Sequence, residues 1–140
     1  MADQPRWAVG ARASLRHTFR REDVAAFAEL SGDRNPIHLD DDAARAAGFA
    51  GVVVHGALVA GLFSRLLGMD LPGAGTVYLG QELRFRRPVH PGDEVVAEVE
   101  VLSCREDKPI LELATRASAG GEPAVEGRAT VLVRSVRDPR

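Results

Sequence analysis

The chain has 140 residues, of which 45% are hydrophobic, and this size and composition suit one compact globular domain. Its 18 Lys and Arg residues nearly balance its 20 Asp and Glu residues, so the net charge of −2 gives no general attraction to nucleic acid or to an anionic membrane. The single cysteine, Cys104, excludes an internal disulfide and a cysteine-based metal cluster. With no apolar run of about 20 residues and a polar segment at residues 1–7, a cytoplasmic protein is expected.

The first part of the chain is expected to form one strand and two helices. A strand is predicted over residues 13–19, and a helix follows it and stops at Gly32. The apolar residues of this helix fall on one face: Val24, Phe27, Ala28 and Leu30. A second, short helix is predicted over residues 40–47, with Asp40 or Asp41 as its N-cap.

The segment between these helices, residues 31–38 (SGDRNPIH), contains the strongest functional signal. Gly32 permits backbone angles that are closed to other residues, and Pro36 fixes its own φ and pushes Asn35 toward an extended shape. An ordinary helix is therefore not expected here. Asp33 and His38 are instead predicted to lie on a stiff, irregular loop, where two proton-transfer groups indicate a site rather than a connector.

Residues 56–67 are predicted to form a helix that is apolar on nearly every side, with Arg65 as its only charge. A helix of this kind is buried. Its length of about 18 Å is too short for a bilayer but suits the centre of a small domain. Gly68 is expected to end the helix.

The second half of the chain predicts a sheet, because its strand patterns alternate with turns. The four predicted strands are residues 76–87, 94–102, 110–117 and 125–133. The fold class is therefore α+β, with one long buried helix against a mainly antiparallel sheet. Since only one substantial helix is available to cover the sheet, a second copy of the chain is expected to cover the rest, giving a homodimer.

The order of these motifs resembles that of the (R)-specific enoyl-CoA hydratases of the MaoC-like dehydratase family, which have the hot-dog fold. The resemblance rests on residues 30–38 (LSGDRNPIH), on residues 53–56 (VVHG) before the apolar helix, and on residues 78–81 (YLGQ) in the sheet. It implies a single hot-dog domain over residues 1–140, with a core at about 9–133, in which a long central helix is wrapped by the sheet. The implied activity is reversible syn hydration of trans-2-enoyl-CoA to (R)-3-hydroxyacyl-CoA.

Hydration requires a water to lose one proton while the alpha carbon of the substrate gains another. Asp33 and His38 can do both if they hold one water between them, although the residues do not assign which is the base and which the acid. The thioester oxygen also needs a donor placed in advance. The N–H of Gly56, in the first turn of the apolar helix, is the expected donor, and His55 is expected to shape the helix entry.

The resemblance also implies where the substrate binds. Ser64 and Leu67 match positions that line the acyl pocket of the family, and the small Ser64 indicates short to medium acyl chains. Arg84, together with Arg86 and Arg87, is expected to meet the CoA diphosphate. The expected partner is thus an acyl-CoA thioester, with no nucleic acid or membrane. No cofactor is expected, since CoA is part of the substrate.

Each assignment has a structural alternative. Gly56 can be a packing glycine, Ser64 and Leu67 plain core, and the arginines a solvated strand face. A metal site formed by His38, Asp40 and His55 has no supporting spacing, so no metal is expected. The alternative functions are a 3-hydroxyacyl-[acyl-carrier-protein] dehydratase, a hot-dog thioesterase and a non-catalytic acyl-CoA-binding module. The intact motif around Asp33 and His38 argues against the last two.

Overall fold

The computed structural model describes residues 7–134. Residues 1–6 and 135–140 lie outside the described part. Residues 1–6 include most of the polar segment in which the sequence predicts no apolar signal-peptide core. Within the described part the elements follow one another as β1 (Arg12–Thr18), α1 (Arg21–Ser31), α2 (Pro36–Leu39), α3 (Asp41–Ala46), α4 (Gly56–Met69), β2 (Thr76–Phe85), β3 (Glu94–Cys104), β4 (Ile110–Ala119) and β5 (Glu122–Val133).

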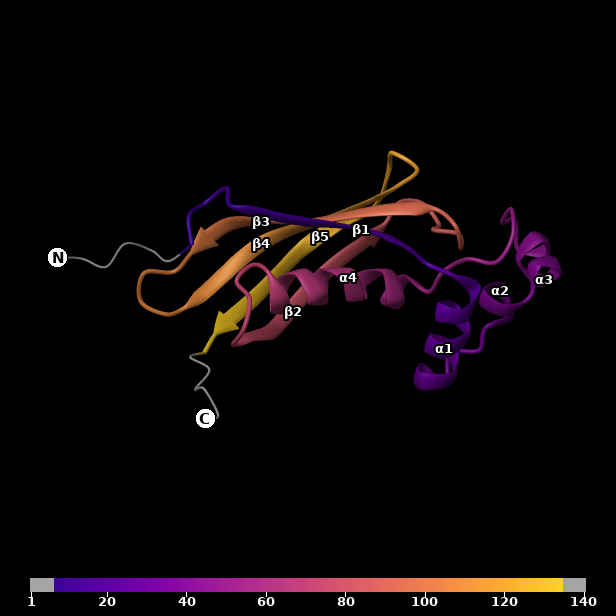
Figure 1. Ribbon diagram of the computed structural model, residues 1–140, viewed down its shortest axis with the longest axis horizontal. Helices are drawn as coiled ribbons and strands as arrows, with labels where there is room; N and C mark the ends of the chain where they lie inside the picture. Colours follow the sequence, from indigo (N-terminus) through magenta and orange to yellow (C-terminus); the bar gives the residue numbers. More distant parts are fainter. Residues whose placement is uncertain (1–6, 135–140) are drawn as a thin grey trace.

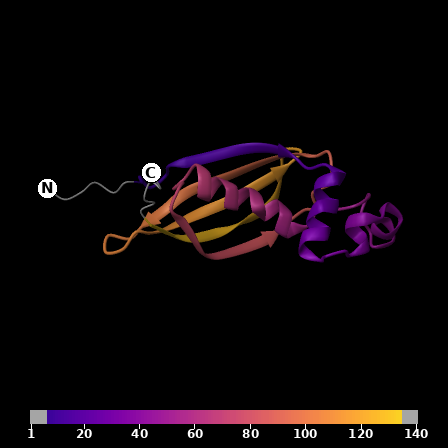
Figure 2. The same cartoon turned by 60° about the horizontal axis from the view of Figure 1, so that its bottom comes forward.

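The strands form one antiparallel sheet in the order β1-β3-β4-β5-β2. Helix α4 runs along one face of this sheet, and helices α1, α2 and α3 gather at one end of it (Figure 1). A second view shows α4 lying lengthwise against the strands (Figure 2). The predicted arrangement of one long helix against an antiparallel sheet is confirmed. Among residues 7–134, no helix is long and apolar enough to cross a membrane.

The core lies between α4 and the sheet, where the alternation of β3 places every second side chain on the covered face. Val95, Ala97, Val99 and Val101 are all completely buried. The residues of α4 that pack against this face are Val59, Leu62, Phe63, Leu66 and Leu67. Burial of this apolar surface is the main driving force that fixes the helix to the sheet.

Helix α4 differs from its prediction in two ways. It continues through Gly68 to Met69 and is capped by the Asp70 N–H, which donates to the Leu66 carbonyl. It is also not buried on every side, because Ala57, Gly61 and Ser64 are exposed. The sheet covers one face of α4, and these small residues lie on a face that this chain leaves open.

The segment that contains Asp33 and His38 is also more regular than predicted. Gly32 has the expected left-handed backbone, with φ of 80°, and its N–H donates to the Ala28 carbonyl as the C-cap of α1. His38, however, lies on the one-turn helix α2, so the prediction of an irregular loop is wrong at this residue. Pro36 occupies the first position of α2, where a missing N–H has no cost, and Asn35 Oδ1 accepts from the Ile37 N–H at 3.3 Å.

Strands β2 and β5 approach each other too closely for a side chain at Gly127. A Cβ there would lie 1.8 Å from the backbone oxygen of Glu82, and a backbone group has little freedom to move. Gly127→Ala is therefore expected to lower the free energy of unfolding by about 3 kcal/mol or more, measured by urea denaturation. Gly80→Ala, in β2, is the matched control because no atom lies within 4 Å of its added Cβ. Equal losses in the two variants would contradict the explanation.

Candidate active site

The two residues that the sequence singles out face each other beside the amino end of α4. Asp33 lies between α1 and α2, and its Oδ2 is 3.9 Å from Nε2 of His38. This separation is too long for a direct hydrogen bond and suits one bridging water molecule. The side chain of Asp33 is half exposed, whereas that of His38 is nearly buried. Solvent can therefore reach the pair from the side of the carboxylate.

The imidazole of His38 is oriented by the backbone. Its Nδ1 lies 2.6 Å from the carbonyl oxygen of Val53, and because a carbonyl can only accept, Nδ1 is the protonated nitrogen. In the neutral ring, Nε2 then keeps its lone pair and points toward Asp33. A second bond, from the Val53 N–H to the Ile37 carbonyl at 3.0 Å, ties α2 to the segment that leads into α4.

The two carboxylate oxygens of Asp33 have different surroundings. Oδ1 accepts a hydrogen bond of 3.2 Å from the Asn35 N–H, and the Asp33 N–H donates to Ser31 Oγ at 3.1 Å. These local bonds make a tight turn of the kind that short polar side chains favour. Oδ2 is left facing His38, so the turn divides the carboxylate into an anchored oxygen and an oxygen available for proton transfer.

His55 contacts both members of the pair and is only 2% exposed. Its Nε2–H donates to the Asp33 carbonyl at 2.9 Å, and its ring stacks on that of His38 with centroids 3.8 Å apart and an angle of 23°. Phe27 also packs edge-on against the ring of His55, with a centroid distance of 4.8 Å. The sequence indicated only that His55 shapes the helix entry; its place directly before a buried helix was the available signal for a larger role.

Asp33, His38 and His55 together form a group that could be considered for a metal ion. The stacking of the two rings argues against this arrangement. An imidazole binds a metal along the lone pair in its ring plane, and two stacked rings with centroids 3.8 Å apart and planes 23° apart are poorly placed to direct both lone pairs to one ion. Asp40, the third residue considered from the sequence, instead caps α3 by accepting from the Asp42 N–H. The absence of a metal stays a prediction.

A cavity of about 440 Å³ opens beside His38 and Gly56, which both line it. This volume falls within the usual range of small-molecule sites. Most of its wall is apolar, and its other lining residues include Phe49, Val53, Phe85, Arg86, Arg87 and Val125. Because α4 begins at Gly56, the N–H of this residue is one of the helix groups without an acceptor inside the helix. A polarised oxygen in the cavity could accept from it.

Gly56 is also required for packing. A Cβ at this position would lie 2.7 Å from Cε1 and 2.8 Å from Cζ of Phe85. The ring of Phe85 therefore rests directly against the start of α4. The role of a packing glycine and that of an oxyanion donor are compatible, because the first concerns the missing side chain and the second the backbone N–H.

The three predicted substrate-binding residues lie apart from this group. Ser64 lines a separate hollow of about 640 Å³ between α4 and β2, and Leu67 is buried in the core with 1% exposure. Arg84 is exposed on β2 and is not among the residues that line the cavity, although Arg86 and Arg87 are. Substrate contacts by Ser64, Leu67 and Arg84 therefore stay predictions.

Asp41 holds the scaffold behind the site together. Its carboxylate accepts from the Val52 N–H at 3.0 Å and from Arg21 at 2.7 and 2.9 Å, joining α1, α3 and the segment before α4. The Val52 N–H, followed by the Arg21 guanidinium, holds the pKa of Asp41 below its usual value. A folded-state pKa below the unfolded value means that this stabilisation is present above about pH 4 and is lost as the pH falls through the folded pKa.

Asp41→Asn is accordingly expected to lower the melting temperature at pH 7, and its difference from the unmodified protein should shrink as the pH is lowered toward about 2. Melting curves across this pH range test the prediction. Asp42→Asn is the control, because Asp42 is 93% exposed and its contact with Arg45 is 3.4 Å long. A deficit of Asp41→Asn that is constant with pH would show that charge is not the cause.

The fold and this group of residues define a MaoC-like protein. The chain belongs to the MaoC-like family, because the model of the MaoC-like domain matches residues 5–120. It is 55% identical over 124 residues to the (R)-specific enoyl-CoA hydratase of Aeromonas caviae, covering 88% of this chain and 92% of that relative. It is also 41% identical over 125 residues to a mitochondrial 3-hydroxyacyl-[acyl-carrier-protein] dehydratase of Arabidopsis thaliana, covering 85% of this chain and 74% of the relative.

The same family is found among solved structures. The (R)-hydratase from A. caviae, involved in PHA biosynthesis, superposes with a TM-score of 0.89 and 51% identity, covering 94% of this chain and all of that one. The R-hydratase PhaJ1 from Pseudomonas aeruginosa superposes with a TM-score of 0.84 and 37% identity, covering 96% and 91% of the two chains. The hot-dog fold and the family that the motifs predicted are confirmed.

Proposed function

We propose that this protein is an (R)-specific enoyl-CoA hydratase, a hydro-lyase that adds water reversibly to trans-2-enoyl-CoA. The observation that carries the proposal is the 3.9 Å separation of Asp33 Oδ2 and His38 Nε2 beside a cavity that Gly56 also lines. Two proton-transfer groups facing one water are what hydration of a conjugated thioester requires. Relatives named as (R)-specific enoyl-CoA hydratases, at 55% and 40% identity, support it.

The proposed reaction uses the two side-chain atoms that face each other, Asp33 Oδ2 and His38 Nε2. A water held between Asp33 and His38 gives one proton to the pair and its hydroxyl group to the beta carbon; as the double bond becomes single, the pair returns a proton to the alpha carbon. Since Nδ1 of His38 is engaged with the Val53 carbonyl, Nε2 is the ring atom that exchanges the proton. Both groups stand on one side of the substrate, so hydroxyl and proton arrive on the same face of the double bond. The two residues act as one coupled unit.

The remaining assignments concern the thioester and CoA. The Gly56 N–H stabilises the negative charge that builds on the thioester oxygen. Arg86 and Arg87 line the cavity and, with Arg84 two residues before Arg86, present the cations for the CoA diphosphate. Arg86 is already paired with Glu126 and Arg87 with Glu122, so a phosphate must compete with these carboxylates. The reaction moves no electrons to an acceptor and uses no cofactor beyond the CoA of the substrate.

We also propose that the protein acts as a cytoplasmic homodimer. The lone Cys104 suits a reducing compartment. Strand β2 is at an edge of the sheet and exposes three adjacent apolar residues, Val77, Tyr78 and Leu79. An exposed apolar edge strand is a surface that a second copy can bury by pairing along it.

The test is hydration of crotonyl-CoA, followed by the loss of enoyl absorbance and by chiral identification of the alcohol. The expected product is (R)-3-hydroxybutyryl-CoA. The second candidate is a 3-hydroxyacyl-[acyl-carrier-protein] dehydratase, because the chain is 41% identical to the plant relative of that name. Such an enzyme would prefer the carrier-protein thioester. Rates on CoA and carrier-protein substrates of equal acyl length separate the two candidates. Release of free thiol with the double bond intact would indicate a thioesterase, and tight binding without turnover an acyl-CoA-binding module.

A further inference from the structure

Phe85 lies between two hollows beside α4, the catalytic cavity of about 440 Å³ and the hollow of about 640 Å³ that contains Ser64. It is the last residue of β2, and its ring lines both the catalytic cavity with His38 and Gly56 and the hollow that contains Ser64. It is the one residue that the two linings share among those of residues 7–134. The ring therefore forms the wall between them.

This wall is a side chain that can move. Phe85 is 55% exposed, and the ring atoms nearest Gly56 are Cε1 and Cζ, at the far end of the side chain. Two torsions carry these atoms away from the helix without any change in the backbone. Because the ring rests against Gly56, a thioester that reaches the Gly56 N–H also meets the ring.

The hollow behind Phe85 suits an alkyl chain. Its floor is a row of small residues on α4, and its other wall is β2; the lining includes Ala57, Ala60, Gly61, Ser64, Leu79 and Leu83. The polar groups at its margin satisfy one another, because the Tyr78 hydroxyl bonds to Gln81, which also donates to Thr115 at 3.0 Å. Burial raises the pKa of Tyr78, so its hydroxyl stays neutral. An alkyl chain in this hollow would leave the hydrogen bonds of Tyr78 and Gln81 intact.

We propose that Phe85 sets the acyl-chain length accepted by the enzyme, by closing the catalytic cavity for short chains and turning aside to join it to the Ser64 hollow for long ones. This proposal deepens the hydratase function and rests on it. With the ring against Gly56, the acyl group must end within the catalytic cavity. With the ring displaced, the chain extends along the small residues of α4 toward Ser64, whose side chain then limits the length.

The exposure of Phe85 also has a simpler explanation, namely that the ring is buried by the second copy of a homodimer. That explanation predicts a change in the oligomeric state when the ring is removed, and no specific change in substrate choice. The experiment therefore includes sedimentation analysis of every variant, so that loss of the dimer is recognised independently of activity.

The experiment measures kcat/KM for crotonyl-CoA and for trans-2-octenoyl-CoA and reports their ratio. Phe85→Ala is expected to shift the ratio toward octenoyl-CoA by about tenfold or more, and Phe85→Trp is expected to shift it the opposite way. Ser64→Leu in the Phe85→Ala background should cancel the gain, because the bulkier side chain fills the hollow. Val9→Ala is the control: it shortens an exposed apolar side chain that lies outside β2 and lines neither hollow, and its ratio should stay unchanged.

The outcomes separate the inference from the function on which it rests. An unchanged ratio in both Phe85→Ala and Phe85→Trp overturns the role of the ring. A gain that persists in the Phe85→Ala/Ser64→Leu variant overturns the path toward Ser64. If the unmodified protein hydrates neither substrate, the hydratase function itself fails. Should Phe85→Ala fail to fold, Phe85→Leu shortens the same wall, and the same ratio applies to it.

Discussion

Asp33→Asn and His38→Gln are each expected to lower kcat for the hydration of crotonyl-CoA by about 10²–10⁴-fold. An amide at position 33 keeps the shape of the side chain but cannot take a proton at the atom that faces His38, 3.9 Å away. Gln at position 38 loses the ring nitrogen that exchanges the proton. Both variants are expected to fold. Because His38→Gln loses the stack on His55 and the bond to the Val53 carbonyl, kcat is measured per folded molecule. Steady-state assays that follow the loss of enoyl absorbance measure kcat.

The double variant gives the sharper result. If both residues act on one water, Asp33→Asn/His38→Gln should lose scarcely more activity than the more damaged single variant, because the second change removes a step already lost. Losses that multiply would mean that the residues act independently. His17→Gln, on β1, is the control for replacing a histidine outside the site. Turnover near that of the unmodified protein in either single variant would refute the acid–base assignment.

The second large effect is expected at His55, a positioning residue that touches both members of the pair. His55→Phe keeps an aromatic ring to stack on His38 but loses the donor to the Asp33 carbonyl, whereas His55→Gln keeps an amide donor but loses the ring. Since small displacements of catalytic groups are costly, each variant is expected to lose about 10²-fold in kcat, with KM for the substrate nearly unchanged. Steady-state kinetics on the folded fraction give both constants.

A purely structural role for His55 would give a different pattern. Both variants would then lose melting temperature, while kcat per folded molecule would stay the same. The two substitutions also separate the contacts: recovery of activity in His55→Gln alone would assign the effect to the hydrogen bond, and recovery in His55→Phe alone would assign it to the stack. His90→Gln, which changes a histidine bonded to the carbonyl of Val52 outside the stack, is the matched control.

The sequence predicted most of the architecture because its signals are local. The alternation of β3 and the apolar run of α4 each follow from residues that are neighbours along the chain or one helical turn apart. Two of the errors arise because tertiary context decides what proline and glycine do. Pro36 breaks a helix in its interior but starts one at the first position, and a glycine such as Gly68 does not end a helix that tertiary packing continues.

The parts of the site that the sequence did not predict depend on contacts between distant segments. His55 reaches the backbone of Asp33, 22 positions earlier in the chain, and no pattern of spacing encodes that distance. Ser64 and Leu67 are three positions apart on α4, yet only Leu67 is buried against the sheet. Arg86 and Arg87 line the cavity and Arg84 does not, because β2 ends at Phe85 and the chain turns there.

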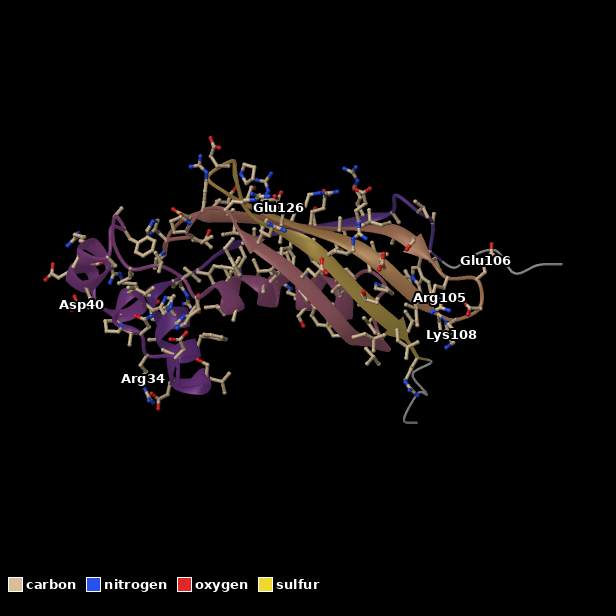
Figure 3. All side chains as sticks on the ribbon, turned by 180° about the vertical axis from the view of Figure 1, so that it is seen from behind. Arg34, Asp40, Arg105, Glu106, Lys108 and Glu126 are labelled. Atoms are coloured by element: carbon tan, nitrogen blue, oxygen red, sulfur yellow. The ribbon has the colours of Figure 1, made fainter. Side chains whose placement is uncertain are left out.

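Two groups of charged residues lie at opposite ends of the molecule. Asp40 and Arg34 lie at the helical end, whereas Arg105, Glu106 and Lys108 lie in the turn between β3 and β4 at the opposite end of the sheet (Figure 3). Arg105 is paired with Asp107 at 2.7 Å within its own turn. Substitutions in that turn should leave hydration unaffected, which makes it a suitable place for a label or an affinity tag.

The anchors of Asp33, His38 and His55 are main-chain atoms: the Asn35 N–H, the Val53 carbonyl and the Asp33 carbonyl. Every amino acid except proline supplies these same atoms. The residues that shape the cavity can therefore be exchanged without altering the chemical identity of the anchors. An engineer could remodel the room for the acyl group while the proton-transfer apparatus keeps its alignment, and selection could diversify substrates along the same route.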